Sequence, residues 1–314
     1  MTLNISSLIE QHRPNIKKST LNIYTQNIKN LNNKNDIKSL DFLKNPEDII
    51  KIVKDKSIPT QRNYLNSALV VLEASGKEEY KSAIDKYQTE LKKFSKKIDD
   101  TYQTKKKTFK ESKNWLTYDE LKDIQKKYKK EIDEMELNKK DSNYVIKPKQ
   151  NKKLLYYLIS SLYTLNPPLR LDWANMTYTK NKKDLEDNKK NWLYDKGTFS
   201  KIVYLNDFKN VRKIGPQQFK LNKELARIIN LYRRFNKGEK FLLNTRGFSM
   251  SQNSLAKMLP LVFTSNGKSV NLNMIRKAAV VNTVNPEQVK KEQELAEDML
   301  HSVGTQKKVY LKTN

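Results

Sequence analysis

Four residues of the chain carry side chains that can do chemistry on a phosphate group. Arg170 lies in PPLRLDW, Arg276 lies in NLNMIRKAA, and His301 precedes Tyr310 by nine positions in HSVGTQKKVY. A guanidinium offers a rigid fork of donors that matches the non-bridging oxygens of a phosphate. A tyrosine hydroxyl, with an ordinary pKa of about 10, becomes a nucleophile where clustered cations favour the phenolate. Together these residue types predict a metal-free phosphoryl-transfer site.

The charge balance indicates a polyanionic partner. The 314 residues include 62 Lys and Arg against 35 Asp and Glu, a formal net charge of +27. Neutralising phosphates with Lys and Arg releases counterions, which drives binding to nucleic acid. The alternative is a solvated lysine-rich surface that reflects an AT-rich genome, such as that of a virus or mobile element, because Lys, Asn and Ile codons are AT-rich. We expect double-stranded DNA as the partner.

The scarcity of some residue types excludes other kinds of site. The chain has no cysteine, and its only histidines are His12 and His301, so neither a thiolate zinc site nor a histidine-rich metal centre is expected. We expect no metal and no small-molecule cofactor. The N-terminal MTLNISSLIEQHRPN lacks a basic region followed by an apolar core, and no apolar run approaches the ~20 residues that span a bilayer. The sequence therefore predicts a soluble, intracellular protein that is neither secreted nor bound to a membrane.

The apolar periodicity predicts a mainly α protein with a small antiparallel β-sheet, organised in two domains. Residues 1–98 carry successive amphipathic helical patterns and are expected to form a helical bundle with a basic exterior. Residues 99–113 lack an apolar period and are expected to form a basic linker that contacts DNA. Residues 114–314 are expected to form a second domain. The linker contains three successive lysines, Lys105, Lys106 and Lys107.

The second domain opens with Thr117 and Glu120, whose spacing matches a helix capping box. Residues 154–165, LLYYLISSLYTL, form the most apolar segment and predict a buried helix that ends before two prolines. Strand signals are confined to about residues 191–221, in NWLY, KIVYL and QQFKL. Further helices are predicted over 222–234, 251–263, 271–283 and 286–300.

The ordered series of Arg170, a lysine, Arg276, His301 and Tyr310 resembles that of the tyrosine recombinases, or phage-type integrases, and of the related type IB topoisomerases. The resemblance covers most of the chain. Residues 1–98 are loosely similar to the family's core-binding domain, including TQRNYLNSAL, which contains a basic residue expected to contact DNA, Arg62. Residues from about 113 onward are similar to its catalytic domain.

The resemblance implies a mechanism. Tyr310 would attack a DNA phosphate in line, forming a covalent 3′-phosphotyrosyl link and a free 5′ hydroxyl. Arg170 and Arg276 would stabilise the charge of the pentavalent phosphate, and His301 would bond to the same oxygens. The family's general acid is a lysine on a hairpin between two strands, which protonates the leaving 5′ oxygen.

Two positions of the resemblance stay open. In KIVYLNDFKNVRKIGPQQFKL the catalytic lysine is Lys209 or Lys213. We take Lys209 first, because it ends the apparent first strand, and we expect Arg212 and Lys213 to contact DNA. The family has His or Lys three residues before its second arginine, where this chain has Asn273. An asparagine can donate a hydrogen bond to phosphate but cannot carry a proton at neutral pH.

The function implied by the resemblance is site-specific recombination or integration by a homotetramer closing around DNA as a C-shaped clamp. Single-site relaxation by a type IB topoisomerase is one alternative. A DNA-binding clamp without chemistry is another, and Asn273 favours it. A metal-dependent nuclease or transposase stays formally open, although no spacing of acidic residues recommends it. Only LKTN follows Tyr310, whereas many family members carry a further helix that docks on the neighbouring protomer.

Overall fold

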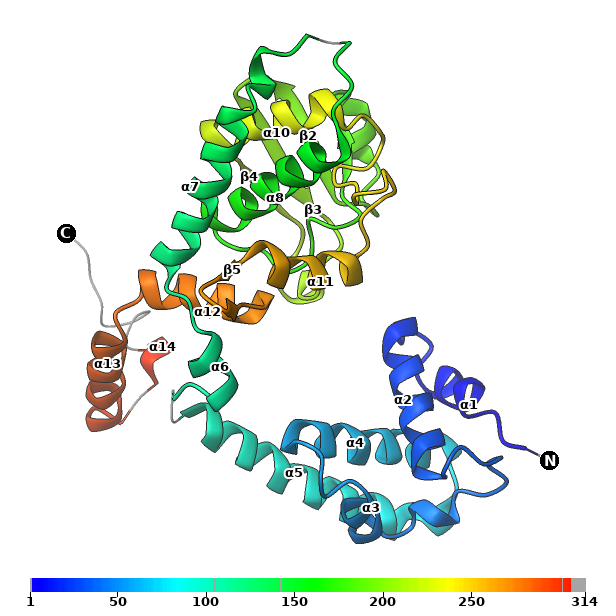
Figure 1. The fold of residues 1–314 in the computed structure, drawn as a ribbon. Coiled ribbons are helices and arrows are strands. Elements are labelled where there is room, and N and C mark those ends of the chain that lie inside the picture. The colour runs from blue at the N-terminus through cyan, green and yellow to red at the C-terminus, as the bar shows by residue number, and fades with distance from the viewer. Residues whose placement is uncertain (1, 104–105, 142, 301, 306–314) are drawn as a thin grey trace. The chain divides into compact units, whose positions relative to one another are not determined.

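The chain divides into two compact units, Met1–Lys107 and Thr108–Asn314. The computed structural model describes residues 2–103, 106–141, 143–300 and 302–305 (Figure 1). The architecture is mainly helical with small β-sheets, as the sequence predicts. Residues 99–103 of the expected linker belong to the last helix of the first unit, and residues 109–113 belong to the first helix of the second unit.

The first unit is a helical bundle built around α4 (Ile58–Ser75). This helix is buried on most sides from Tyr64 to Leu72, because the other helices of the unit pack on it. Gly76 ends it in the left-handed conformation at φ 63°, which glycine adopts without a steric penalty. The surrounding elements are α1 (Ile5–His12), α2 (Lys18–Leu31), α3 (Pro46–Ile52), α5 (Lys81–Gln103) and two 3₁₀ turns, Asp41–Leu43 and Glu78–Tyr80.

The second unit is built around α8 (Pro148–Thr164), the apolar helix predicted from the sequence. Its residues from Leu154 onward are almost all buried, since α7, α10 and α11 pack against it (Figure 1). The predicted helices that follow are confirmed to within two residues at each end. The helices beside α8 are α6 (Phe109–Asn114), α7 (Tyr118–Glu134), α9 (Val211–Ile214), α10 (Lys223–Phe235), α11 (Gln252–Val262), α12 (Leu272–Thr283), α13 (Pro286–Asp298) and α14 (Val303–Thr305), with 3₁₀ turns at Leu137–Lys139 and Lys182–Glu186.

A four-stranded sheet with the order β1-β2-β3-β4 packs in the same unit. The strands are β1 (Thr177–Thr179), β2 (Trp192–Gly197), β3 (Ser200–Leu205) and β4 (Gln217–Lys220). The expectation of a purely antiparallel sheet is wrong, because β1 pairs with β2 in parallel while the other pairs are antiparallel. β1 has only three residues, too few to show an alternating pattern in the sequence.

A second, two-stranded sheet joins β5 (Thr264–Ser265) to β6 (Lys268–Ser269) just before α12. Both turn residues, Asn266 and Gly267, have positive φ values of 50° and 73°. A two-residue Asn-Gly turn of this kind suits the twist of an antiparallel pair. No helix in the described ranges is both long enough and apolar enough to cross a bilayer.

Candidate active site

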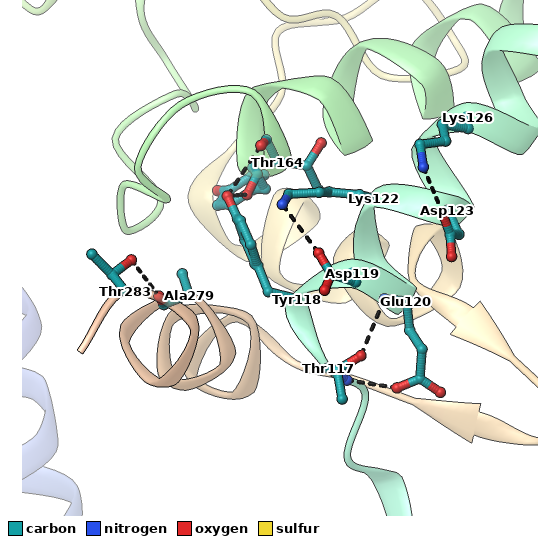
Figure 2. Close-up of polar contacts among 11 residues, drawn as sticks. Thr117, Tyr118, Asp119, Glu120, Lys122, Asp123, Lys126, Thr164, Ala279 and Thr283 are labelled. Carbon is teal, nitrogen blue, oxygen red and sulfur yellow. Dashed lines mark hydrogen bonds and ion pairs between the residues drawn. The ribbon is translucent and has the colours of Figure 1, made fainter. Parts of the chain in front are cut away.

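The N-terminus of α7 is held by the capping box that the sequence predicts. The Thr117 hydroxyl accepts a hydrogen bond from the Glu120 backbone N–H at 3.2 Å, and the Glu120 carboxylate accepts one from the Thr117 N–H at 2.6 Å. These two bonds satisfy donors that the first turn of a helix leaves free. Tyr118, the first residue of α7, is thereby fixed, and its side chain reaches the end of α8 (Figure 2).

Residues 164–170, which lead from α8 to Arg170, are held by side chains of other elements. The Tyr118 hydroxyl donates a hydrogen bond to the carbonyl oxygen of Thr164 at 3.1 Å. From the start of α10, the Asn222 Nδ2 group donates to the carbonyl oxygen of Leu165 at 2.6 Å. The last carbonyl groups of a helix have no partner within the helix, so these bonds satisfy them and fix the path of the segment.

The same segment connects the two candidate catalytic arginines. Arg276, on α12, donates a hydrogen bond from Nη1 to the carbonyl oxygen of Pro168 at 2.6 Å. The buried Tyr163 hydroxyl donates to the carbonyl oxygen of Arg170 at 2.7 Å. The backbone around Arg170 is therefore tied to both α8 and α12. The two arginines, far apart in the sequence, belong to one local structure.

The two guanidinium groups are close enough to influence each other. The pKa of Arg276 is lowered, first by burial and then by the positive charge of Arg170. Arg170 is half-buried, and within the described ranges its side chain makes no hydrogen bond and no close ion pair. The donors of Arg170 thus remain available to an anion. A guanidinium matches the geometry of phosphate oxygens, so this arrangement is compatible with binding of a phosphate group.

Asp172 is the nearby acidic group. Burial raises the pKa of its carboxyl, and hydrogen bonds from the backbone of Asp172 and Arg170, with attraction to both arginines, offset only part of this effect. Arg170 and Asp172 do not form an ion pair at contact distance. A local ion pair between them is therefore not the structural role of Arg170. Asp172 therefore reduces the positive charge of the site without accepting hydrogen bonds from the two guanidinium groups.

A groove of about 550 Å³ lies beside Arg276. One wall is the end of α8 with the segment that follows it, and the other is the α12 face running from Arg276 to Val284. Tyr118 also lines the groove, and Figure 2 shows Ala279 and Thr283 of α12 beside its ring. Asn166 also lines the groove, and its buried Nδ2 atom has no hydrogen-bond partner among the described residues.

The candidate lysines lie on one connection between antiparallel strands, as the sequence predicts. β3 ends at Leu205, four residues before Lys209, so the expectation that Lys209 ends the strand is wrong. Lys213 and Arg212 lie on the short helix α9 before β4. All three side chains are exposed. Their positions on the connection do not distinguish which of them would be the general acid.

Asn273 is exposed in the first turn of α12. It precedes Arg276 by three residues, a spacing that places both on the same side of a helix. The Asn271 side chain caps this helix by accepting a hydrogen bond from the Met274 N–H at 3.1 Å. Asn273 is therefore beside the arginine, where a hydrogen-bond donor could reach a bound anion.

The remaining expected site residues belong to the first unit or lie outside the described residues. His301, Tyr310 and Lys105 lie outside the described residues. Lys106 and Lys107 are exposed just before α6. Arg62 lies in the first unit, where its Nε donates to the Ser95 hydroxyl at 2.9 Å and so joins α4 to α5.

A buried charged network in the sheet was missed from the sequence. The Lys201 side chain is fully buried and donates hydrogen bonds to Asp195 at 2.6 Å and to the Gly197 carbonyl oxygen at 2.7 Å. The Tyr178 hydroxyl donates to the other Asp195 oxygen, and the Arg233 guanidinium lies 4.0 Å from the centre of the Tyr178 ring. The alternation of β3 places Lys201 on the same face as Val203, a signal that could have revealed its burial.

Among the described residues, no group of three or more His, Cys, Asp or Glu side chains is arranged to hold a metal ion. Comparison of the chain with models of protein families finds no match, and comparison with curated proteins finds no significant relative.

Proposed function

We propose that this protein is a tyrosine-type DNA strand transferase, acting inside the cell as a site-specific recombinase or integrase on double-stranded DNA. The observation that carries the proposal is the Arg170–Arg276 pair. The Arg276 guanidinium is bound to the carbonyl oxygen of Pro168, two residues before Arg170, and its pKa is lowered in part by the positive charge of Arg170. Among the described residues, nothing occupies the hydrogen-bond donors of the Arg170 side chain. The net charge of +27 supports a polyanionic substrate.

In the proposed reaction, the Tyr310 oxygen attacks phosphorus and the bond from phosphorus to the 5′ oxygen breaks. Arg170 and Arg276 stabilise the negative charge that builds on the non-bridging oxygens, together with His301 and Asn273. Lys209 donates a proton to the leaving 5′ oxygen. Attack by the 5′ hydroxyl of another strand then releases Tyr310 and joins the new partner.

The DNA contacts of the proposal come from basic residues in both units. Arg62 and the lysines at 105–107 would contact the backbone before the second unit. Arg212 and Lys213 would contact it beside Lys209. A homotetramer on two DNA sites follows from recombination itself, since two duplexes must each be cleaved on both strands.

The test is covalent trapping on a nicked duplex whose cleaved fragment diffuses away. Because the target is unknown, the duplexes carry a randomised region, and the DNA of any adduct is sequenced. Wild type, Tyr310→Phe and Tyr102→Phe are compared in chelator on a denaturing gel; Tyr102 is a matched control that is 70% exposed. We expect an adduct with wild type and Tyr102→Phe, and none with Tyr310→Phe.

An adduct that survives in Tyr310→Phe would overturn the assignment of the nucleophile. A second candidate function, a DNA-binding clamp without chemistry, is favoured by Asn273 at a position where the family has a residue that can carry a proton. That function predicts binding with a steep salt dependence and no adduct from the whole library. Joining of two sites, rather than relaxation of one plasmid, separates a recombinase from a topoisomerase.

A further inference from the structure

Helix α6 is fastened to the elements around Arg276 by two side chains. Near its middle, the Glu111 carboxylate forms an ion pair with Lys277 of α12. At its end, the Asn114 side-chain oxygen accepts a hydrogen bond from the Ser269 N–H of β6 at 3.2 Å. The first contact holds α12 near its middle, next to Arg276, and the second holds β6, which leads directly into α12.

The two oxygens of Glu111 have separate partners. Oε2 accepts a hydrogen bond from the Thr108 N–H at 2.9 Å and so completes the capping box of α6, while Oε1 meets Lys277. The Glu111 side chain is only 16% exposed, whereas Lys277 is 51% exposed. The carboxylate is therefore fixed by its own helix before it meets α12, and it acts as a rigid anchor for Lys277.

Lys277 and Arg276 are consecutive, so they point about 100° apart around the axis of α12. Arg276 is tied on one side to the Pro168 carbonyl, and Lys277 is tied on another side to Glu111. Two ties at different angles resist rotation of the helix about its axis. A guanidinium lies several ångströms from that axis, so even a small rotation displaces it. A displacement of about 1 Å can cost about 10²-fold in rate.

We propose that Glu111 is a positioning residue for the proposed reaction: through Lys277 it sets the rotation of α12 and thus places Arg276 against the phosphate. This inference rests on the proposed function. An ion pair with a half-exposed lysine contributes little to global stability. Glu111 therefore acts by positioning α12. Its replacement changes the rate of adduct formation rather than the free energy of unfolding.

Three variants separate this role from helix capping. Glu111→Gln removes the charge that meets Lys277 but keeps a residue that can complete a capping box. Lys277→Gln removes the other partner. Thr108→Ala removes the cap of α6 and leaves the ion pair intact. At saturating DNA, we expect Glu111→Gln to lower the rate of adduct formation about tenfold, with DNA affinity within about twofold of wild type. Thr108→Ala should stay within about twofold of the wild-type rate.

The double variant Glu111→Gln/Lys277→Gln tests whether the two residues act as a pair. We expect it to be no slower than either single variant, because interacting residues are not additive. Multiplied defects in the double variant, or a wild-type rate in Glu111→Gln, would overturn the proposal. A defect of Lys277→Gln confined to DNA affinity would show that Lys277 acts on DNA directly, and would overturn it as well.

Amide hydrogen exchange keeps this inference testable without any reaction. In the free protein, Glu111→Gln should speed exchange in residues 272–283 more than Thr108→Ala does. Equal exchange in the two variants would overturn the proposal. If wild type forms no adduct while α12 exchanges faster in Glu111→Gln, the strand-transfer function fails and the positioning of α12 by Glu111 stands.

Discussion

Arg276 and Pro168 are joined by a 2.6 Å hydrogen bond from the guanidinium Nη1 to the backbone carbonyl oxygen. The bond connects α12 to the segment that carries Arg170. The side chain that we propose as catalytic thus also links α12 to the segment before Arg170. In the proposed reaction, an Arg276 guanidinium held in this way would need little reorganisation at the moment of reaction, which favours stabilisation of the transition state.

Replacing Arg276 tests this double role. Arg276→Lys keeps the charge but loses the planar fork that can bond to Pro168 and phosphate together. We expect the rate of adduct formation to fall by about 10²–10³ and amide exchange in residues 166–170 to rise. Arg227→Lys, which changes an arginine stacked on Phe199, is the matched control and should alter neither. An unchanged rate in Arg276→Lys would contradict the proposed site.

Tyr163→Phe removes the donor that holds the carbonyl oxygen of Arg170. The bond is partly buried, and losing a typical hydrogen bond of this kind costs about 0.5–1.5 kcal/mol. We expect that loss in the free energy of unfolding of the second unit, measured in urea by tryptophan fluorescence, because Trp115, Trp173 and Trp192 all lie in that unit.

The control for Tyr163→Phe is Tyr87→Phe in the first unit. The Tyr87 hydroxyl is buried without a hydrogen-bond partner, so its removal should leave stability, followed by circular dichroism, unchanged or raised. Equal losses of stability in the two variants would show that the hydrogen bond from Tyr163 to the Arg170 carbonyl does not account for the effect.

The pKa of Asp172 predicts a pH dependence. Burial raises this pKa above the ordinary value, so the folded state holds the proton more tightly than the unfolded state. The contribution of Asp172 to stability is then full below its unfolded pKa and is lost as pH rises through its folded pKa. Asp172→Asn should therefore gain stability relative to wild type as the pH rises from about 3 to about 7.

Asp187 is a control for which the opposite dependence of stability on pH is expected. Hydrogen bonds from the Lys189 backbone and the Lys190 side chain lower its pKa. The contribution of Asp187 to stability is present above its unfolded pKa and is lost as the pH falls. Asp187→Asn should therefore lose stability relative to wild type as the pH rises from about 3 to about 7. The two trends are measured by urea unfolding across pH; parallel trends would refute the assignment for Asp172.

The buried Lys201–Asp195 pair predicts a large effect on stability. Lys201 is fully buried and Asp195 is 9% exposed. Removing one partner leaves an uncompensated charge, which costs about 3–5 kcal/mol. We expect Lys201→Met to lower the free energy of unfolding of the second unit by this amount. Lys190→Met breaks an exposed pair with Asp187 at 3.1 Å and should cost no more than about 1 kcal/mol. Similar losses in both would place Lys201 in solvent rather than in the core.

The choice between Lys209 and Lys213 can be settled with DNA that has sulfur in place of the bridging 5′ oxygen. A thiolate leaves without a proton, so the general acid is not needed. Lys209→Ala should slow cleavage of ordinary DNA by about 10²–10⁴ and recover on the sulfur substrate. Lys213→Ala should be near wild type on both, and the reverse pattern would reassign the general acid.

The sequence by itself determined the local structure of this protein. Helix α10 covers Lys223–Phe235 where 222–234 was predicted, and the Thr117–Glu120 capping box forms as its spacing indicates. Such features arise from contacts between residues three or four positions apart, so the periodicity of the sequence predicts them. The charge balance, and the residue types that led to the proposed function, are likewise properties of the sequence.

Only the tertiary structure decided what these elements bring together. The bond from Arg276 to Pro168 and the parallel pairing of β1 with β2 join segments whose separation no periodicity records. Each depends on how α8, α12 and the sheet pack around one core. Packing is a collective outcome of shape and burial, and for that reason the mutual positions of the two arginines could not be read from the chain.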